Sequence, residues 1–330
     1  MNWLLPALLV GGVVFGAPAC GSDSNGDGLK KVTVMLDWTP NTNHAGIFLA
    51  KEEGWYRDAG LDVQIVEPAS GGVEQVVAAG KADFGISVQE QVIPARAQGI
   101  PIVSIGAIMQ HNTSSLFALA KSGITRPKDL EGKTYGGFGG ALETALVKKM
   151  VTCDGGDASR VKFVEVGNVD YLVGMEQGAF DFAWIFDGWD GLRATEVEHK
   201  QVTSLPFINY PQCIPDWYTP LIITNESHVK SQPDLVKKFM QATARGYDEA
   251  IANPQASADA LLKNAPESDK TLVNASAKYL AARYVDKGRQ WGLQDADTWS
   301  GFAKFLKEAG LVDREIDTKS AFTNEFLPKR

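Results

Sequence analysis

The 330-residue sequence has only three cysteines and four histidines, and its basic residues form no cluster. Three cysteines in a chain of this length make no disulfide framework, and their positions show no metal-ligand spacing. The histidines lack the H-E-x-x-H spacing, and no G-x-S-x-G elbow is present. The net charge of −8 argues against nucleic acid or an anionic membrane face as a partner. We therefore expect no catalytic residues, no metal and no cofactor.

Long hydrophobic runs are also lacking, apart from one near the N-terminus. Residues 4–17 are nearly all apolar and uncharged. This run is shorter than the about 20 residues that span a bilayer and has the length of a signal-peptide core, so residues 1–19 are predicted to be an export signal. Cys20 follows and opens a polar, glycine-rich tether over residues 20–30.

A cysteine between an apolar run and a flexible tether resembles the lipobox of bacterial lipoproteins. We therefore expect Cys20 to be lipidated and to anchor the protein on the outer face of the cell membrane. Ala17-Pro18-Ala19 would also suit cleavage that releases a soluble protein. Beyond Cys20, only Cys153 and Cys213 remain, and they would either pair or stay as two buried thiols; the second interpretation is preferred.

From Lys31 onward, short apolar runs alternate with helix-length runs, which is typical of an α/β fold with parallel sheets covered on both faces. Two such blocks and a helical tail after Pro233 predict two α/β lobes. Lobe 1 is expected to be discontinuous, over residues 31–117 and 221–330, and lobe 2 to comprise residues 118–220. The predicted strands are residues 32–36, 61–66, 83–87, 102–108, 133–137, 161–166, 181–186 and 221–224, and the predicted crossing segments lie near residues 116–120 and 218–224.

Ligands of open α/β sheets bind beyond the carboxyl ends of the strands, and several aromatic residues lie at such ends. Large rings there can stack on a planar ligand. We assign stacking roles to Trp38, Trp189 and Tyr218, and packing roles to Trp184 and Trp217.

Polar residues occupy the same strand ends and the helix starts that follow them. His44 is either a ligand contact or a helix cap. Glu90 and Glu143 begin helices, where a carboxylate is often only a favourable dipole partner, but Glu90 in a cleft could accept two hydrogen bonds from an amidine-like ring edge. The glycine loop at residues 136–140 lacks the Lys-Ser/Thr of a P-loop and is interpreted as a tight turn that lines the cleft. The polar candidates are Asn41, Asn43, His44, Ser87, Glu90, Glu143, Asp187 and Asp190.

Taken together, these segments resemble the NMT1/THI5-like family of periplasmic binding proteins, and most closely its thiamine-pyrimidine (formylaminopyrimidine) binding branch. The resemblance implies a type II periplasmic-binding fold that closes on a ligand as a monomer, and an ABC permease and ATPase as partners. The implied ligand is a thiamine-precursor aminopyrimidine such as formylaminopyrimidine or hydroxymethylpyrimidine. The stretches that carry it are DWTPNTNHAG (37–46), GKADFGISVQEQ (80–91), GKTYGGFG (132–139), DFAWIF (181–186), YTP (218–220) and AFTNEFLP (321–328).

Two alternatives stay open. The pyrimidine-binding branch more often has an aromatic residue at the position of Asp187, which leaves binding of riboflavin or another aromatic heterocycle as an alternative. The family also includes a pyrimidine synthase that consumes its own histidine and a pyridoxal phosphate held on a lysine. Those two residues would fall at Gln91 and Ser87 here, and a serine cannot form the Schiff base.

Overall fold

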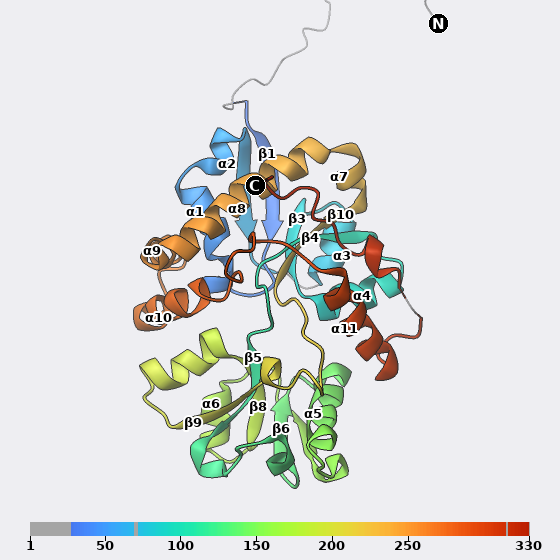
Figure 1. Cartoon of the computed structure of the whole chain (residues 1–330). Helices are drawn as coiled ribbons and strands as arrows, with labels where there is room; N and C mark the ends of the chain where they lie inside the picture. Colours follow the sequence, from blue (N-terminus) through green and yellow to red (C-terminus); the bar gives the residue numbers. More distant parts are fainter. Residues whose placement is uncertain (1–27, 69–71, 315, 330) are drawn as a thin grey trace, which may run out of the picture.

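Two lobes lie one above the other and are joined by two extended segments (Figure 1). The computed structural model describes residues 28–68, 72–314 and 316–329. The predicted export signal and Cys20 lie outside the described residues. Within the described ranges, no helix has both the length and the apolar character that crossing a bilayer requires.

Lobe 1 is built on a five-stranded sheet with the order β2-β1-β3-β10-β4. β1 is parallel to β2 and β3, whereas β10 is antiparallel to β3 and β4. The predicted all-parallel sheet is therefore wrong, because a strand from late in the sequence inserts between two early ones. The strands are β1 (Lys30–Met35), β2 (Leu61–Val66), β3 (Phe84–Ser87), β4 (Ile102–Ala107) and β10 (Leu221–Asn225).

Lobe 2 repeats this arrangement with the order β7-β6-β8-β5-β9. β6 is parallel to β7 and β8, and β5 lies antiparallel between β8 and β9. The sequence does not predict β5 or β9 as strands. The strands are β5 (Ser114–Leu119), β6 (Thr134–Gly137), β7 (Lys162–Glu165), β8 (Phe182–Phe186) and β9 (Val202–Pro206).

Helices cover both faces of the lobe 1 sheet (Figure 1). One layer contains α1 (Ala45–Glu52), α2 (Trp55–Asp58), α8 (Pro233–Ala252), α9 (Pro254–Asn264) and α10 (Lys270–Ala281). The other contains α3 (Val73–Ala78), α4 (Gln89–Ala97) and α11 (Ala296–Glu308). α7 (Glu226–Ser231) follows β10, and α5 (Ala141–Cys153) and α6 (Tyr171–Glu176) belong to lobe 2.

The long helix α8 is fixed to the sheet by an apolar stripe at helical spacing. Its Phe239 ring stacks on Phe84 of β3, with the ring centroids 3.8 Å apart. α8 also crosses α1 so closely that a Cβ on Gly246 would lie 1.9 Å from the carbonyl oxygen of Gly46. Only glycine permits this approach, which places the loop before α1 against the C-terminal helices.

The chain crosses between the lobes at residues 108–113 and again at residues 207–220. The predicted lobe boundary at residue 117 falls inside β5, whereas the boundary after residue 220 coincides with the start of β10. The sequence places the first crossing too late because the strand character of residues 114–119 is not apparent from their mixed polarity.

Away from the crossing segments, the lobes touch where α10 meets the turn η5 (Asp187–Gly191), which is followed by η6 (Arg193–Val197). Ser276 of α10 donates a hydrogen bond to the carbonyl oxygen of Gly188, and Thr42 of lobe 1 bonds to the same serine hydroxyl. A Cβ on Gly188 would lie 2.9 Å from the Leu280 side chain. Glycine at this position therefore allows lobe 2 to rest directly on α10.

A disulfide joins Cys153, at the end of α5, to Cys213 in the second crossing segment. The preferred interpretation of two unpaired buried thiols is therefore wrong. The sequence separation of 60 between the two cysteines hides the fact that the returning chain passes the end of α5. The bond fastens the second crossing segment to lobe 2.

We predict that this disulfide stabilises the protein mainly by restricting the unfolded chain. For a loop of this length, the loss of unfolded-chain entropy corresponds to a stabilisation of about 4 kcal/mol. Reductant should therefore lower the urea midpoint of the wild-type protein. A Cys153→Ala/Cys213→Ala double variant should show the lower midpoint without reductant and no further change with it. An identical midpoint for oxidised and reduced wild type would contradict this account.

A histidine also links the two crossing segments. His111 lies in the first, with its Nδ1 2.5 Å from Asp216 Oδ2 of the second and its Nε2 3.1 Å from Asp286 Oδ2. Asp216 Oδ1 accepts a second hydrogen bond from the backbone N–H of Asn112. The hydrogen bond to Asp216 is the main cause that raises the pKa of His111 to about 9.

This cluster predicts a pH-dependent stability. Because the folded-state pKa of His111 exceeds its ordinary value of 6.5, its contribution is fully present below about pH 6.5 and is lost as the pH rises through about 9. The free energy of unfolding, measured with urea, should decline between these two pH values in the wild-type protein. The decline should be smaller in His111→Asn. The control His199→Asn, at a φ of 52° that asparagine tolerates, should keep the wild-type decline. Equal declines in wild type and His111→Asn would refute this prediction.

Candidate functional site

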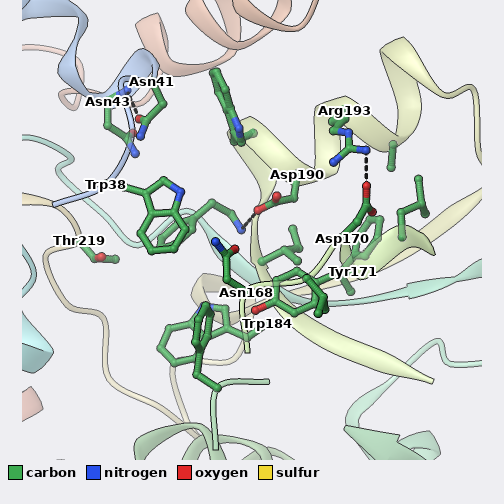
Figure 2. A pocket seen from close by; sticks show the side chains of 18 of the residues that line it. Trp38, Asn41, Asn43, Asn168, Asp170, Tyr171, Trp184, Asp190, Arg193 and Thr219 are labelled. Carbon is green, nitrogen blue, oxygen red and sulfur yellow. Dashed lines mark hydrogen bonds and ion pairs between the residues drawn. The ribbon is translucent and has the colours of Figure 1, made fainter. Parts of the chain in front are cut away.

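A cavity of about 280 Å³ lies between the lobes at the carboxyl ends of β1, β6 and β8 (Figure 2). This is the position at which α/β sheets bind ligands. Lobe 1 contributes Asp37, Trp38, Asn41 and Asn43 to its wall, and the second crossing segment contributes Thr219 and Pro220. Lobe 2 contributes Phe117, Phe138, residues 168–172, Trp184, Ile185, Phe186, Trp189, Asp190, Arg193 and Ala194.

The lobe 1 wall is the loop between β1 and α1, which is held in place by a buried histidine. The Nδ1 of His44 accepts the backbone N–H of Asn41 at 3.2 Å, and its Nε2 donates to Asp37 Oδ1 at 2.7 Å. The Asn41 side chain caps the turn by accepting the backbone N–H of Asn43 at 3.0 Å. The loop thus presents the Asp37 carboxylate and the Trp38 ring to the cavity in a fixed geometry.

The lobe 2 wall is formed by the end of β8 and the π-helical turns η5 and η6. Asp190 accepts the backbone N–H of Phe186 at 3.3 Å. Burial raises the pKa of Asp190 because the carboxylate is largely removed from water. Arg193 lies beside it and donates to both Asp170 and Glu198, as Figure 2 shows for the pair with Asp170.

Aromatic rings line the cavity from both lobes. Trp38, 48% exposed, and Phe138, 50% exposed, meet edge to face across the lobes with their ring centroids 6.5 Å apart. Trp184 lines the cavity and packs edge to face on Trp217 at 6.1 Å behind it. With Trp189 these rings make an apolar slot that suits a flat ligand.

Two polar atoms at the cavity wall are buried without a hydrogen-bond partner in the described part of the protein. They are the hydroxyl oxygen of Thr219, whose side chain is fully buried, and the indole nitrogen of Trp184. Unpaired buried polar groups cost free energy and are rare in folded proteins. Both residues line the cavity.

The structure brings five of the predicted site residues to the cavity wall, namely Trp38, Asn41, Asn43, Trp189 and Asp190. His44 lies directly behind the wall and acts as the cap and as the support of Asp37. The sequence left both interpretations of His44 open, and the structure shows the capping geometry. Trp184, which was predicted to have a packing role, packs on Phe207 and also lines the cavity.

The other lobe 1 candidates turn inward and are not part of the cavity wall. Ser87 donates to Glu74, and Glu90 accepts the indole N–H of Trp217 at 2.9 Å. Burial raises the pKa of Glu90 to about 8. The hydroxyl of Tyr218 accepts the backbone N–H of Asp295 at 2.8 Å. Their partners come from distant segments, so the sequence could not show that these side chains are already engaged.

Two of the three acidic candidates of lobe 2, Glu143 and Asp187, have structural partners away from the cavity wall. Glu143 accepts the backbone N–H groups of Gly140 at 3.0 Å and Phe138 at 3.2 Å, and so holds the glycine loop that carries Phe138. Asp187 accepts the hydroxyls of Ser115 at 2.5 Å and Ser204 at 2.9 Å. The expectation that Asp187 faces the cleft is not met by the structure, because its side chain points toward β5 and β9.

Sequence reasoning missed several residues of the wall. Asp37 lies within the motif of Trp38 and could have been found as the first polar residue after a predicted strand. Thr219 lies in the quoted YTP motif. Residues 168–172 and Arg193 gave no signal, because they lie outside the motifs that carry the family resemblance. In the described part of the chain, no group of three or more His, Cys, Asp or Glu is arranged to hold a metal ion.

Comparison with solved structures shows the fold. The alkanesulfonate-binding protein SsuA from Xanthomonas axonopodis pv. citri superimposes with a TM-score of 0.68 at 14% identity, over 89% of this chain and 98% of that protein. The aliphatic sulphonate binding protein SsuA from Escherichia coli gives 0.68 at 16% identity, over 88% and 91%. The predicted two-lobed periplasmic-binding fold is confirmed.

Sequence relatives include both binding proteins and enzymes. The formylaminopyrimidine-binding protein of Halalkalibacterium halodurans is 27% identical over 315 residues, which is 91% of this chain and 92% of that protein. The 4-amino-5-hydroxymethyl-2-methylpyrimidine phosphate synthase of Legionella pneumophila is 26% identical over 91% of this chain and 93% of its own length. A family model described as NMT1/THI5 like matches residues 41–257. The chain therefore belongs to the NMT1/THI5-like family, as its motifs predict.

Proposed function

We propose that this protein is an extracytoplasmic solute-binding protein that captures a thiamine-precursor aminopyrimidine between its lobes for an ABC importer. The observation that carries the proposal is the inter-lobe cavity, with rings on both walls and unpaired polar atoms at Thr219 and Trp184. A flat heterocycle with ring nitrogens and an amino group offers both a face to stack and edges to hydrogen-bond. The name of the H. halodurans relative supports this ligand class.

Two observations favour binding over synthesis. Ser87, at the position where the synthase has its lysine, is buried and donates to Glu74. Gln91, at the position of the consumed histidine, is exposed on the surface of α4. Neither residue lines the cavity, and neither can supply the amine or the imidazole that the synthase uses.

Delivery to a permease requires that the protein be outside the cell membrane. Lipidation of Cys20 would hold it there, and the tether of about ten residues before β1 would leave both lobes free to move. A mass spectrum of the mature N-terminus tests this part of the proposal: an acylated Cys20 supports it, and an unprocessed Met1 contradicts it.

Calorimetry with formylaminopyrimidine, hydroxymethylpyrimidine, thiamine and riboflavin tests the ligand class. An aminopyrimidine should bind with a Kd between about 1 μM and 1 nM, which corresponds to about −8 to −12 kcal/mol. Trp38→Ala should weaken this binding about 30-fold, since the lost stacking and apolar burial amount to about 2 kcal/mol.

Two control variants accompany Trp38→Ala. Ile208→Ala removes an exposed apolar side chain away from the cavity, and Glu90→Gln changes the carboxyl behind Trp217. Both should keep the wild-type affinity within about threefold. Binding that is unaffected by Trp38→Ala would contradict the placement of the ligand. Consumption of pyridoxal phosphate by the purified protein would contradict the proposal as a whole.

A further inference from the structure

The charged groups that line the cavity do not balance. Three carboxylates face it, those of Asp37, Asp170 and Asp190, against one guanidinium, that of Arg193. Arg193 donates to Asp170 and also to Glu198 at 2.7 Å, so its positive charge is already matched by two carboxylates. No lysine contributes to the described wall of the cavity.

The two remaining carboxylates are held by uncharged donors. Asp37 accepts from the Nε2–H of His44, whose Nδ1 accepts a backbone N–H and therefore carries no proton. Asp190 accepts backbone N–H groups, among them that of Phe186 at 3.3 Å, and Arg193 acts on it only at longer range. Asp37 and Asp190 come from opposite lobes, so each wall presents one uncompensated negative charge.

The raised pKa of Glu90, about 8, keeps this buried carboxyl largely protonated near neutral pH, so it adds no charge to the cavity wall. Glu74 and Glu90 are both buried, and the carboxylates of Asp37 and Glu74 contribute to the raised pKa of Glu90. An uncompensated carboxylate in a partly desolvated site is unfavourable, and a cation placed beside it relieves the cost. The faces of Trp38 and Trp189 would attract the same cation through their π electrons.

We propose that the cleft selects planar heterocycles that carry a positive charge, with Asp37 and Asp190 as the two selecting carboxylates, and that it excludes phosphorylated forms of the same rings. The inference rests on the proposed function, because it uses the same cleft, and it adds the charge of the ligand. A phosphate group would meet two like charges from opposite walls, with no free cation in the described wall to pair with it.

Calorimetry on the full chain with two matched ligand pairs tests the inference. The pairs are thiamine and thiamine monophosphate, and hydroxymethylpyrimidine and its phosphate. In each pair the ring is constant, and the second member adds a phosphate group with its negative charge and its volume. We expect the phosphate ester to bind at least about 100-fold more weakly in both pairs, and thiamine, with its permanently cationic ring, to bind measurably.

Asp37→Asn and Asp190→Asn should each weaken thiamine binding about tenfold or more. Each should also reduce the difference in affinity between thiamine and thiamine monophosphate. The exposed Asp58→Asn has the same change in net charge and should leave both affinities unchanged. Asp190→Asn should also raise the thermal midpoint of the ligand-free protein, because burial disfavours the charged carboxylate it removes. If Asp190 had a purely structural role, Asp190→Asn would lower both the thermal midpoint of the protein and its affinity for thiamine.

The possible results distinguish a failure of the charge inference from a failure of the proposed function. If aminopyrimidines bind but their phosphates bind equally well, or if Asp37→Asn and Asp190→Asn leave the discrimination unchanged, the charge inference is overturned and the proposed function stands. If no heterocycle binds to wild-type protein with a normal thermal midpoint, both are overturned.

Discussion

The contact between η5 and α10 holds the two lobes at the separation that creates the cavity. It depends on a hydrogen-bond chain from Thr42 through Ser276 to the carbonyl of Gly188, and on the absence of a side chain at Gly188. The same turn carries Trp189 and Asp190, so the element that docks the lobes also supplies the lobe 2 wall. One short π-helical segment therefore both docks the lobes and lines the cavity, and elements of this type are frequent at functional sites.

The two crossing segments are linked to each other and to lobe 2. The disulfide at Cys213 fixes the second segment to lobe 2, while the His111–Asp216 pair ties it to the first. The two crossing segments thus form one cross-linked connection between the lobes, which we propose to act as their hinge. A hinge of this kind suits a protein whose two walls must open for entry and then meet around a ligand without rearranging their own side chains.

The sequence was sufficient for most of the fold, because strands such as residues 61–66 are short apolar runs bounded by turn residues. It did not reveal β5 and β9, whose pairing partners are distant in the chain. At the cavity, the sequence predicted which loops form the wall but not which way their side chains point. Glu90 and Tyr218 lie beside the right strand ends yet point to Trp217 and Asp295, and such tertiary partners leave no local signal.

The central claim is that a flat, chemically unchanged ligand occupies the cavity and touches both lobes at once. A crystal structure of the protein with a bound aminopyrimidine or thiamine tests it most directly. The account predicts intact ring density against Trp38 of lobe 1 and Trp189 of lobe 2, within hydrogen-bonding reach of Thr219. A ligand bound outside this cavity, or density for a ring covalently altered by the protein, would contradict it.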